Sequence, residues 1–367
     1  MPSVLIFGAG SIGNHLTHAA LIKKWDVSVM DIDEKALNRM KDNIYPSRYG
    51  KWDEKIKLIN NKKYIKKFYD YIFVGTPPNT HLFVAIESLK YTNSNVMMIE
   101  KPLTTPEMYL AEEFYKIISH RKIQCFVGYT HAVSKVISKL FEIKLNNPSL
   151  GKIKKLTVNW KEHWEGIFNA HPWLSGPEDS YLGQWKMGGG AIGEHSHGLN
   201  LWLVIAKLFE MGKITQVSAQ VNYVDKNNIS YDSDSKIHVT TEKNLKGVVF
   251  QDVITMPPEK KIVVEFERGK IEIEINKNSL SDELYLSDNN SNENFKYKKN
   301  RVDDFIQEIN HIEMLGLNSE KSPISLINGL ETMLVISASH MSGNNSSRNV
   351  NIDYSKGYTN KSLRLST

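Results

Sequence analysis

Residues 4–13 read Val-Leu-Ile-Phe-Gly-Ala-Gly-Ser-Ile-Gly, a short apolar run followed at once by a glycine-rich turn. The apolar run is typical of a buried strand, and the residues after the turn have the spacing of a helix. In such a turn Gly8 makes the tight bend, Gly10 lets the backbone approach a pyrophosphate, and Gly13 lets helix and strand pack closely. The helix N-terminus adds free N–H groups and a partial positive charge. We therefore predict a dinucleotide-binding loop formed by Gly8, Gly10, Ser11, Ile12 and Gly13.

The chain around this loop alternates between two periodicities. Apolar runs that predict strands lie at 4–7, 27–30, 71–74, 96–99 and 124–127, with a weaker one at 56–59. Helical spacing falls at 11–23, 34–41, 81–90 and 106–119. Such alternation indicates a parallel, doubly wound sheet with helices on both faces. We assign residues 1–128 to this Rossmann-type domain.

The pattern changes after residue 128. Strands that alternate with polar positions are expected at 151–164, 214–224, 236–241, 247–255, 261–267 and 270–275, and helices at 133–145, 188–207, 301–315 and 324–340. This favours a mostly antiparallel sheet with one covered face. The second domain is therefore α+β and spans 129–367, with closing helices at about 301–340 that pack back toward the first domain. Residues 342–367 are polar and are expected to be weakly structured.

Composition limits the class of protein. The 367 residues are 41% hydrophobic and 24% charged, which is ordinary for a globular protein of about two domains. The net charge of +5 is too mild to indicate nucleic acid, though it tolerates an anionic substrate. The one cysteine, Cys125, lies in an apolar run and fits inert core in a reducing compartment. No apolar run approaches the ~20 residues that span a bilayer, and a strand from Ser3 leaves no room for a signal peptide, so we expect a cytoplasmic protein.

The end of the second strand carries a carboxylate. Asp31 stands near the spacing expected for an acid that binds the ribose hydroxyls. A carboxylate there repels a 2′-phosphate and so favours NAD over NADP. Asp33 is an alternative ribose ligand, and the nearby Lys35 and Arg39 leave NADP open.

Two further segments follow strands of the same sheet. The loop Gly-Thr-Pro-Pro-Asn-Thr-His covers residues 75–81, and Glu100-Lys101-Pro102 follows the strand at 96–99. The carboxyl edge of such a sheet is where ligands bind, which puts Lys101 near a cofactor or substrate. Pro102 could hold a cis bond after Lys101. The predicted nicotinamide-side residues are Thr76, Pro77, Asn79, His81, Glu100 and Lys101. The alternatives are a plain turn with Asn79 or Thr80 as helix cap, and a surface lysine before a proline.

A second glycine-rich segment runs from Lys186 to Gly198. Three consecutive glycines there allow close backbone approach to a ligand. Glu194 and His197 are separated by three positions, which puts both on one face of a continuous helix. An acid beside a histidine suits proton transfer near neutral pH, because the acid can orient and stabilise the imidazolium. Metal binding is the alternative, but zinc would want more nitrogen or sulfur ligands, and we predict no metal.

Together these motifs resemble the Gfo/Idh/MocA oxidoreductases, the relatives of glucose-fructose oxidoreductase and inositol dehydrogenase. The resemblance covers nearly the whole chain and rests on the glycine loop, Gly75-Thr76-Pro77 with His81, Glu100-Lys101-Pro102, Gly128-Tyr129, and Gly188-Gly189-Gly190 followed by an acid and His197. It implies a Rossmann domain joined to an α/β domain with a large open sheet, and a bound nicotinamide cofactor. It also implies dimers or tetramers formed through that sheet. Glu194 stands where the family usually has aspartate, and Thr130-His131 replaces an Asn-Arg type of sequence.

The resemblance implies a function in which Lys101 is the motif lysine and His197 the acid/base. The expected reaction moves hydride between NAD(P) and a carbinol of a sugar or polyol, with nucleotide-linked and amino sugars favoured. His197 would take the hydroxyl proton, and Lys101 would stabilise the developing negative charge. The predicted substrate-binding residues are Lys101, Tyr129, His163, Trp173, Trp185, Glu194 and His197. For Trp173 and Trp185, packing as core anchors is the alternative to stacking on a sugar ring.

Two other functions stay open at the level of sequence. A Rossmann protein could hold NAD or a sugar and regulate a partner without catalysis. An enzyme could also oxidise and re-reduce one substrate with a tightly held NAD during elimination or glycoside cleavage. Neither the sugar, the direction of the reaction nor the oligomeric state follows from the sequence.

Overall fold

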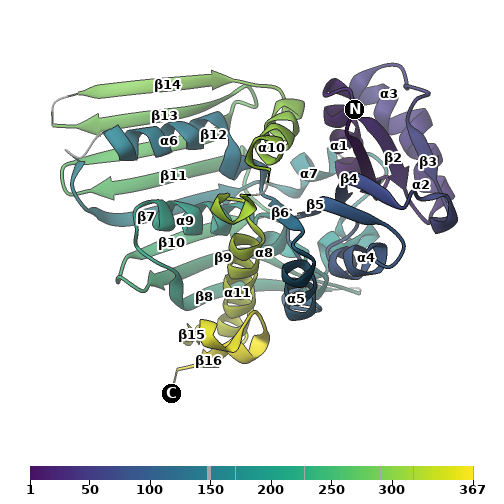
Figure 1. Cartoon of the computed structure of the whole chain (residues 1–367). Coiled ribbons are helices and arrows are strands. Elements are labelled where there is room, and N and C mark those ends of the chain that lie inside the picture. The colour runs from purple at the N-terminus through teal and green to yellow at the C-terminus, as the bar shows by residue number, and fades with distance from the viewer. Residues whose placement is uncertain (147–149, 170, 227, 290, 317, 367) are drawn as a thin grey trace. The chain divides into compact units, whose positions relative to one another are not determined.

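Six parallel strands form the first sheet of the computed structural model, in the order β3-β2-β1-β4-β5-β6 (Figure 1). The structure describes all residues except 147–149, 170, 227, 290, 317 and 367. The chain divides into two compact units, which are described separately. Unit 1 comprises Met1–Thr104, Tyr109–Thr130 and Arg301–Ile327, and unit 2 comprises Thr105–Met108, His131–Asn300 and Asn328–Thr367.

Unit 1 alternates strands and helices as its sequence predicts. Its strands are β1 (Ser3–Phe7), β2 (Asp26–Met30), β3 (Lys57–Ile59), β4 (Phe68–Val74), β5 (Asn93–Glu100) and β6 (Gln124–Gly128). Its helices are α1 (Ser11–Ile22), α2 (Glu34–Arg39), α3 (Tyr45–Tyr49), α4 (His81–Ser88), α5 (Ala111–Arg121) and α10 (Arg301–Leu315). The strand order reverses direction between β1 and β4, and at such a switch point doubly wound sheets bind ligands.

Helix α10 packs against α1 although almost 300 residues separate them in the chain. The imidazole of His15 stacks on the ring of Phe305 with centroids 4.6 Å apart. Lys23 donates to the Asn310 side chain at 2.9 Å and pairs with Glu313 at 2.7 Å. Helix α1, which follows the glycine turn, is therefore held by α10 as well as by the strands of the sheet.

Unit 2 is built on ten strands in the order β14-β13-β12-β11-β7-β10-β9-β8-β15-β16. Among the strand pairs of its described residues, only β7 and β10 run parallel. The strands are β7 (Ile153–Lys161), β8 (Ile214–Lys226), β9 (Ile229–Thr241), β10 (Lys246–Asp252), β11 (Glu259–Phe266), β12 (Gly269–Lys277), β13 (Ser281–Asp288), β14 (Asn292–Lys298), β15 (Val350–Ile352) and β16 (Leu363–Leu365). The helices are α6 (Lys135–Asn146), α7 (Trp164–Asn169), α8 (Gly190–Glu194), α9 (His197–Leu208) and α11 (Leu326–Gly343).

One face of this sheet is covered. Helices α6, α8 and α9 contact its strands, and alternate residues such as Leu156, Val158 and Trp160 of β7 are buried (Figure 1). Period-two burial of this kind is what an antiparallel sheet with one packed face requires. The predicted fold class, a Rossmann sheet plus an α+β unit with a large and mostly antiparallel sheet, is confirmed.

Three local predictions were wrong. The second helix does not stop near Lys41 but continues through a π-helical turn, Met40–Ile44, into α3. Helix α5 begins at Ala111, because Met108 and Leu110 adopt left-handed backbone conformations that interrupt the predicted helix. The C-terminal tail adds β15 and β16 to the large sheet, since strands of three residues are too short for their alternation to be recognised.

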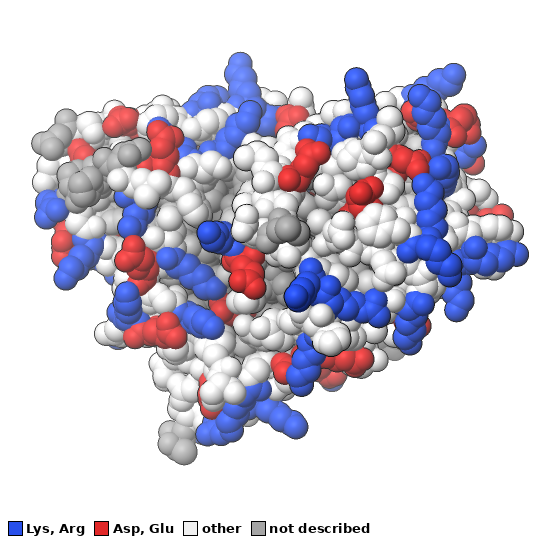
Figure 2. Space-filling model, in the orientation of Figure 1, with Lys and Arg blue, Asp and Glu red and all other residues white. Residues whose placement is uncertain are grey.

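A lysine-rich segment lies at one edge of unit 1. Seven exposed lysines and two acidic residues give residues 51–67 a net charge of +5, equal to that of the whole chain. Figure 2 shows this basic region beside β3 and α3, the edge of the six-stranded sheet. Lysines on an edge strand oppose pairing with another chain, which is a sufficient reason for them. Along the described parts of the chain, no helix is long and apolar enough to cross a membrane.

Candidate functional site

The glycine loop of unit 1 has the geometry of a phosphate cradle. Gly8 has φ +102°, and a Cβ there would lie 2.7 Å from the Gly75 carbonyl oxygen. A Cβ on Gly13 would lie 2.0 Å from the Gly8 carbonyl oxygen. A Cβ on Gly10, by contrast, would meet no protein atom within 4 Å. Two glycines therefore pack the loop, and the third leaves open space at the start of α1, where N–H groups attract an anion.

Asp31 lies at the rim of this loop. Its Oδ2 accepts a hydrogen bond from the Ala9 N–H at 2.8 Å, and its Oδ1 accepts one from the Asp33 N–H at 2.9 Å. Asp33 instead caps α2, because its Oδ1 accepts from the Lys35 N–H at 3.0 Å. Of the two acids, Asp31 is thus the one held against the glycine loop.

His81 links two of the predicted loops. Its Nδ1 lies 3.0 Å from the Pro102 carbonyl oxygen, and its Nε2 lies 2.5 Å from that of Thr76. The side chain is buried, and burial lowers the pKa of His81 to about 4 against the opposing effect of these carbonyls. The side chain therefore holds the β4–α4 loop to the Lys101–Pro102 segment. The Lys101–Pro102 bond is cis, as predicted.

The rest of that loop is partly exposed. Thr80, and not Asn79, precedes α4, and its Oγ1 bonds to the Thr76 Oγ1 at 2.9 Å and the Pro77 carbonyl at 2.8 Å. Thr76, Asn79 and Lys101 are partly buried, and Pro77 is exposed.

Glu100 is buried at the end of β5. Its Oε2 accepts from the Lys101 N–H at 3.2 Å, and a Cβ on Gly128 would lie 2.7 Å from its Oε1. Glu308 of α10 is fully buried nearby. Burial, reinforced by the negative charges of Glu100 and Asp304, raises the pKa of Glu308 well above its usual range. Burial and the neighbouring acids therefore favour the neutral form of the Glu308 carboxyl group more than that of an exposed glutamate.

The predicted continuous helix at 188–207 is broken in unit 2. Helix α8 ends at Glu194, His195 and Ser196 form a turn, and α9 begins at His197. The prediction of one continuous helix was therefore wrong, and the i,i+3 argument, which assumed such a helix, does not apply to Glu194 and His197. Both side chains are partly exposed, whereas His195 is buried.

Unit 2 surrounds His197 with aromatic rings. The Trp160 ring stacks on its imidazole at 5.7 Å between centroids, and His131 contacts it edge-on at 4.8 Å. Trp160 belongs to β7, and both Trp160 and His131 are buried. The contacts with these two rings restrict the orientation of the His197 imidazole. The sequence did not indicate them, because the three residues are far apart in the chain.

The other predicted substrate residues differ in their surroundings. Tyr129 is fully buried. Trp185 is partly exposed and stacks on the ring of His340, with centroids 4.5 Å apart. His163 uses its Nδ1 to accept the Glu165 N–H at 3.0 Å at the start of α7. Trp173 is partly exposed and contacts the ring of His171.

Two buried polar side chains were missed by sequence reasoning. Asp232 of β9 and Gln251 of β10 both hydrogen-bond to the backbone of the segment that carries Glu194 and His197. Gln251 is a polar residue beside the apolar run Val248-Val249-Phe250, which was a weak signal, but Asp232 stands among other polar residues and had none. Cys125 is buried, and burial raises the pKa of its thiol, so the thiolate that a nucleophile needs is disfavoured.

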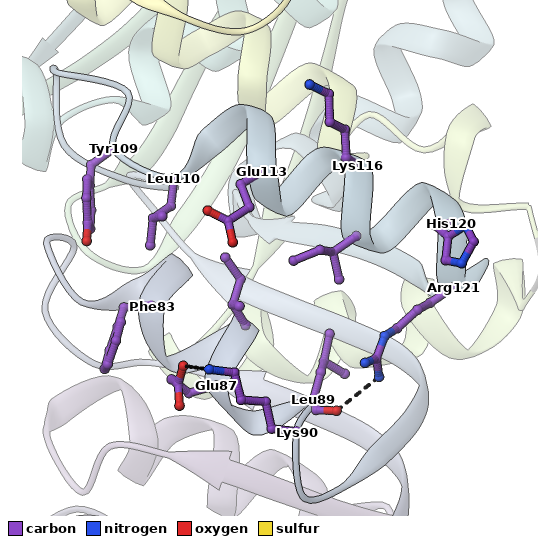
Figure 3. Close-up of a pocket in the computed structure, with 12 residues that line it drawn as sticks. Phe83, Glu87, Leu89, Lys90, Tyr109, Leu110, Glu113, Lys116, His120 and Arg121 are labelled. Atoms are coloured by element: carbon purple, nitrogen blue, oxygen red, sulfur yellow. Dashed lines mark hydrogen bonds and ion pairs between the residues drawn. The ribbon is translucent and has the colours of Figure 1, made fainter.

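A groove of about 610 Å³ lies elsewhere in unit 1, between α4 and α5 (Figure 3). Phe83 and Tyr109 lie at one end of it, and Arg121 bonds to the Leu89 carbonyl at the other. None of the predicted cofactor or substrate residues lines it. Among the described residues, no cluster of three or more His, Cys, Asp or Glu side chains could hold a metal ion.

No protein-family model and no curated protein sequence matches the chain. Solved structures do match. An inositol dehydrogenase homologue from Azotobacter vinelandii, complexed with NAD+, has a TM-score of 0.75 at 14% identity over 95% of this chain and 97% of that one. Levoglucosan dehydrogenase with NADH also has a TM-score of 0.75, at 13% identity over 95% and 98% of the two chains. A 3-ketoreductase from Actinomadura kijaniata with NADP and TDP-benzene reaches 0.71, at 13% identity over 93% and 97%.

The chain therefore has the fold of dinucleotide-bound oxidoreductases, over nearly its whole length. The fold implied by the resemblance to Gfo/Idh/MocA proteins is confirmed. At these identities the likeness concerns the fold, so the activity has to be argued from the residues.

Proposed function

We propose that the protein is an NAD-dependent oxidoreductase acting on a secondary alcohol or ketone of a sugar or polyol. The observation that carries the proposal is the glycine loop, where open space at Gly10 is flanked by two packed glycines and by Asp31. Residues 1–128 would supply the cofactor half and residues 129–367 the substrate half. Structures of this fold bound to NAD+, NADH or NADP support the same reading.

The residues present fit a dinucleotide. The N–H groups at the start of α1 suit the pyrophosphate, and Asp31 suits the ribose hydroxyls and disfavours a 2′-phosphate. Thr76, Pro77, Asn79 and Lys101 are assigned to the nicotinamide side, with His81 and Glu100 holding their loops. When bound, the nicotinamide supplies the hydride acceptor or donor.

The chain's own residues then have separate roles. His197, oriented by Trp160 and His131, accepts the proton of the substrate hydroxyl in the oxidation direction and returns it in reduction. The Lys101 ammonium stabilises negative charge that develops on the substrate oxygen. Glu194, at the end of α8, supplies a negative charge near the start of α9 in support of a protonated His197.

The substrate class is proposed more finely as a nucleotide-linked or amino sugar. The partly exposed Trp173 offers a ring face for a sugar or base, and His163 lies on the loop after β7. A relative of this fold was crystallised with TDP-benzene and another with L-sorbose, so both free and nucleotide-linked sugars belong in the test.

We also propose a homodimer or homotetramer formed through the uncovered face of the large sheet. Lys277 pairs there with Glu274 at 2.7 Å and with Glu283 at 3.1 Å, and Lys261 and Lys270 both pair with Glu272. If these charged residues instead form ion pairs between subunits, the interface would weaken in salt. Light scattering at low and high ionic strength tests this, and a monomer at both would contradict it.

The function is tested by following NADH formation and consumption with a panel of polyols, free sugars and nucleotide-linked sugars. On the best substrate we expect Lys101→Ala and His197→Ala each to lower kcat/KM at least ~100-fold, as general acid–base and electrostatic groups do. Lys116→Ala, an exposed lysine paired with Glu112, is the matched control and should be unchanged.

Three results would contradict the proposal in different ways. Wild-type kcat/KM in both variants would remove these residues from the reaction. NAD binding with no hydride transfer to any panel member would favour a sensor. Product without net NADH would favour transient use of the cofactor.

A further inference from the structure

Helix α8 begins without a side-chain cap of its own. Its N-cap is Gly189, which has no side chain to accept the free N–H groups of the first turn. Asp232 of β9 supplies the acceptor from a distance of 40 residues in sequence, because its Oδ2 accepts the Ile192 N–H at 2.6 Å. The carboxylate is fully buried, so this contact is shielded from water. When Asp232 is ionised, the helix dipole also favours its negative charge at the helix start.

The glycines at the start of α8 and within it pack closely against other protein atoms. Gly190 has φ +74°, and a Cβ there would lie 1.9 Å from the Asp232 Oδ1. A Cβ on Gly189 would lie 2.1 Å from the Tyr181 carbonyl oxygen, and one on Gly193 would lie 2.2 Å from that of Gly188. The close approach that the glycines permit is therefore an approach to protein atoms, and at Gly190 the partner is Asp232.

A second buried side chain holds the other end of the same segment. Gln251 of β10 donates from its Nε2 to the His195 carbonyl oxygen at 2.5 Å, within the turn that joins α8 to α9. Strands β9 and β10 are neighbours in the sheet. Two adjacent strands thus fix the first turn of α8 and the turn before α9, and Glu194 and His197 lie between or directly after these points.

We propose that Asp232 is a positioning residue for the reaction proposed above, setting the place of Glu194 and His197 through the start of α8. It does not touch substrate, since it is fully buried. The expected effect of Asp232 on kcat rests on the proposed function, whereas its expected effect on backbone hydrogen exchange does not. Gln251 supports the same segment through a separate contact.

The charge of Asp232 gives the role a pH signature. Burial raises the pKa of Asp232 to about 8, although the N–H groups of Ile192 and Ala191 act in the opposite direction. Asp234 of its own strand adds to the rise, and Tyr223 faces it from β8. Ionisation as the pH rises through about 8 strengthens its bond to the helix start, because a charged acceptor is the stronger one.

The experiment compares Asp232→Ala and Asp232→Asn with Thr241→Val. Thr241 is a buried, hydrogen-bonded residue of the same strand, whose Oγ1 accepts the Leu245 N–H away from α8. We expect Asp232→Ala to lower kcat at least ~10-fold with the Kd for NAD within twofold. Asp232→Asn should recover most of kcat at neutral pH, because its amide oxygen can still accept from Ile192, but should lose the inflection of the wild-type profile near pH 8. Thr241→Val should keep both kcat and the profile.

Hydrogen exchange of the backbone over residues 188–197 is measured on the same proteins. Faster exchange there in Asp232→Ala, but not in Thr241→Val, is expected whether or not a substrate has been found. Unchanged exchange, or wild-type kcat in Asp232→Ala, would overturn the proposal. If Asp232→Ala does not fold, a pH profile of Asp232→Asn identical to the wild type would overturn it. If Asp232→Ala alters hydrogen exchange but the wild-type protein transfers hydride to no substrate, the proposed function alone would be rejected.

Discussion

Two glycine-rich segments in this protein look alike in sequence and differ in what their glycines face. In the loop after β1, a Cβ on Gly10 would meet open space. In the segment at the start of α8, a Cβ on Gly189 would overlap a carbonyl oxygen, and a Cβ on Gly190 would overlap the carboxyl group of Asp232. The first segment is thus open to a ligand, and the second is filled by the protein. A run of glycines predicts close approach, but only the structure says what approaches.

The sharpest way to break this comparison is to add one methyl group to each segment. Gly190→Ala should destabilise unit 2 by about 3 kcal/mol, because the Cβ overlaps Asp232 and the backbone is left-handed. Gly10→Ala should leave the free energy of unfolding nearly unchanged, yet weaken NAD binding at least ~10-fold because the methyl group occupies the space for phosphate. Urea unfolding and calorimetric titration with NAD measure the two effects.

The opposite pattern would reverse our reading of the segments. If Gly10→Ala bound NAD as tightly as the wild type, the open space at Gly10 would not be a phosphate cradle. If Gly190→Ala unfolded like the wild type, the close fit between Gly190 and Asp232 would not be required.

Acid titration compares the two units through one buried histidine in each. Burial lowers the pKa of His81 in unit 1 to about 4 and that of His340 in unit 2 to about 3, from 6.5. A depressed pKa means that the folded state resists protonation, so the stability is present above pH 6.5 and is lost as the pH falls toward the folded value. Across that window, each histidine should lower the free energy of unfolding by about 3 kcal/mol or more, because one unit of pKa corresponds to ~1.4 kcal/mol.

The variant His340→Phe isolates the contribution of His340 to this acid dependence. A phenyl ring keeps the stacking on Trp185 but cannot be protonated. We expect the loss of unfolding free energy between pH 6.5 and 4 to shrink by roughly half relative to the wild type, since His81 still titrates. An unchanged acid dependence would remove His340 from the account of acid sensitivity.

The difference between the two units also explains which features could be predicted from the sequence. The fold of unit 1 was readable because its signal is local: the Gly8–Gly13 spacing, the proline after Lys101, and the acid at the end of the second strand all lie within short stretches. The second half depends on contacts of long range, such as Asp232 to Ile192 over 40 residues and Gln251 to His195 over 56. No periodicity encodes such a pair. The break between Glu194 and His197 was missed for a related reason, because helical spacing continues through a turn of two residues.

The smallest effect concerns the two acids after β2, which the sequence left open as ribose ligands. Asp33 caps α2, so Asp33→Ala should cost about 1 kcal/mol of unfolding free energy and leave the Kd for NAD unchanged. Asp31→Ala should instead weaken NAD binding and narrow the preference over NADP, because its carboxylate is held against the glycine loop at Ala9. Calorimetric titration of both variants with both cofactors makes the comparison. A loss of NAD affinity in Asp33→Ala with none in Asp31→Ala would move the ribose contact to Asp33.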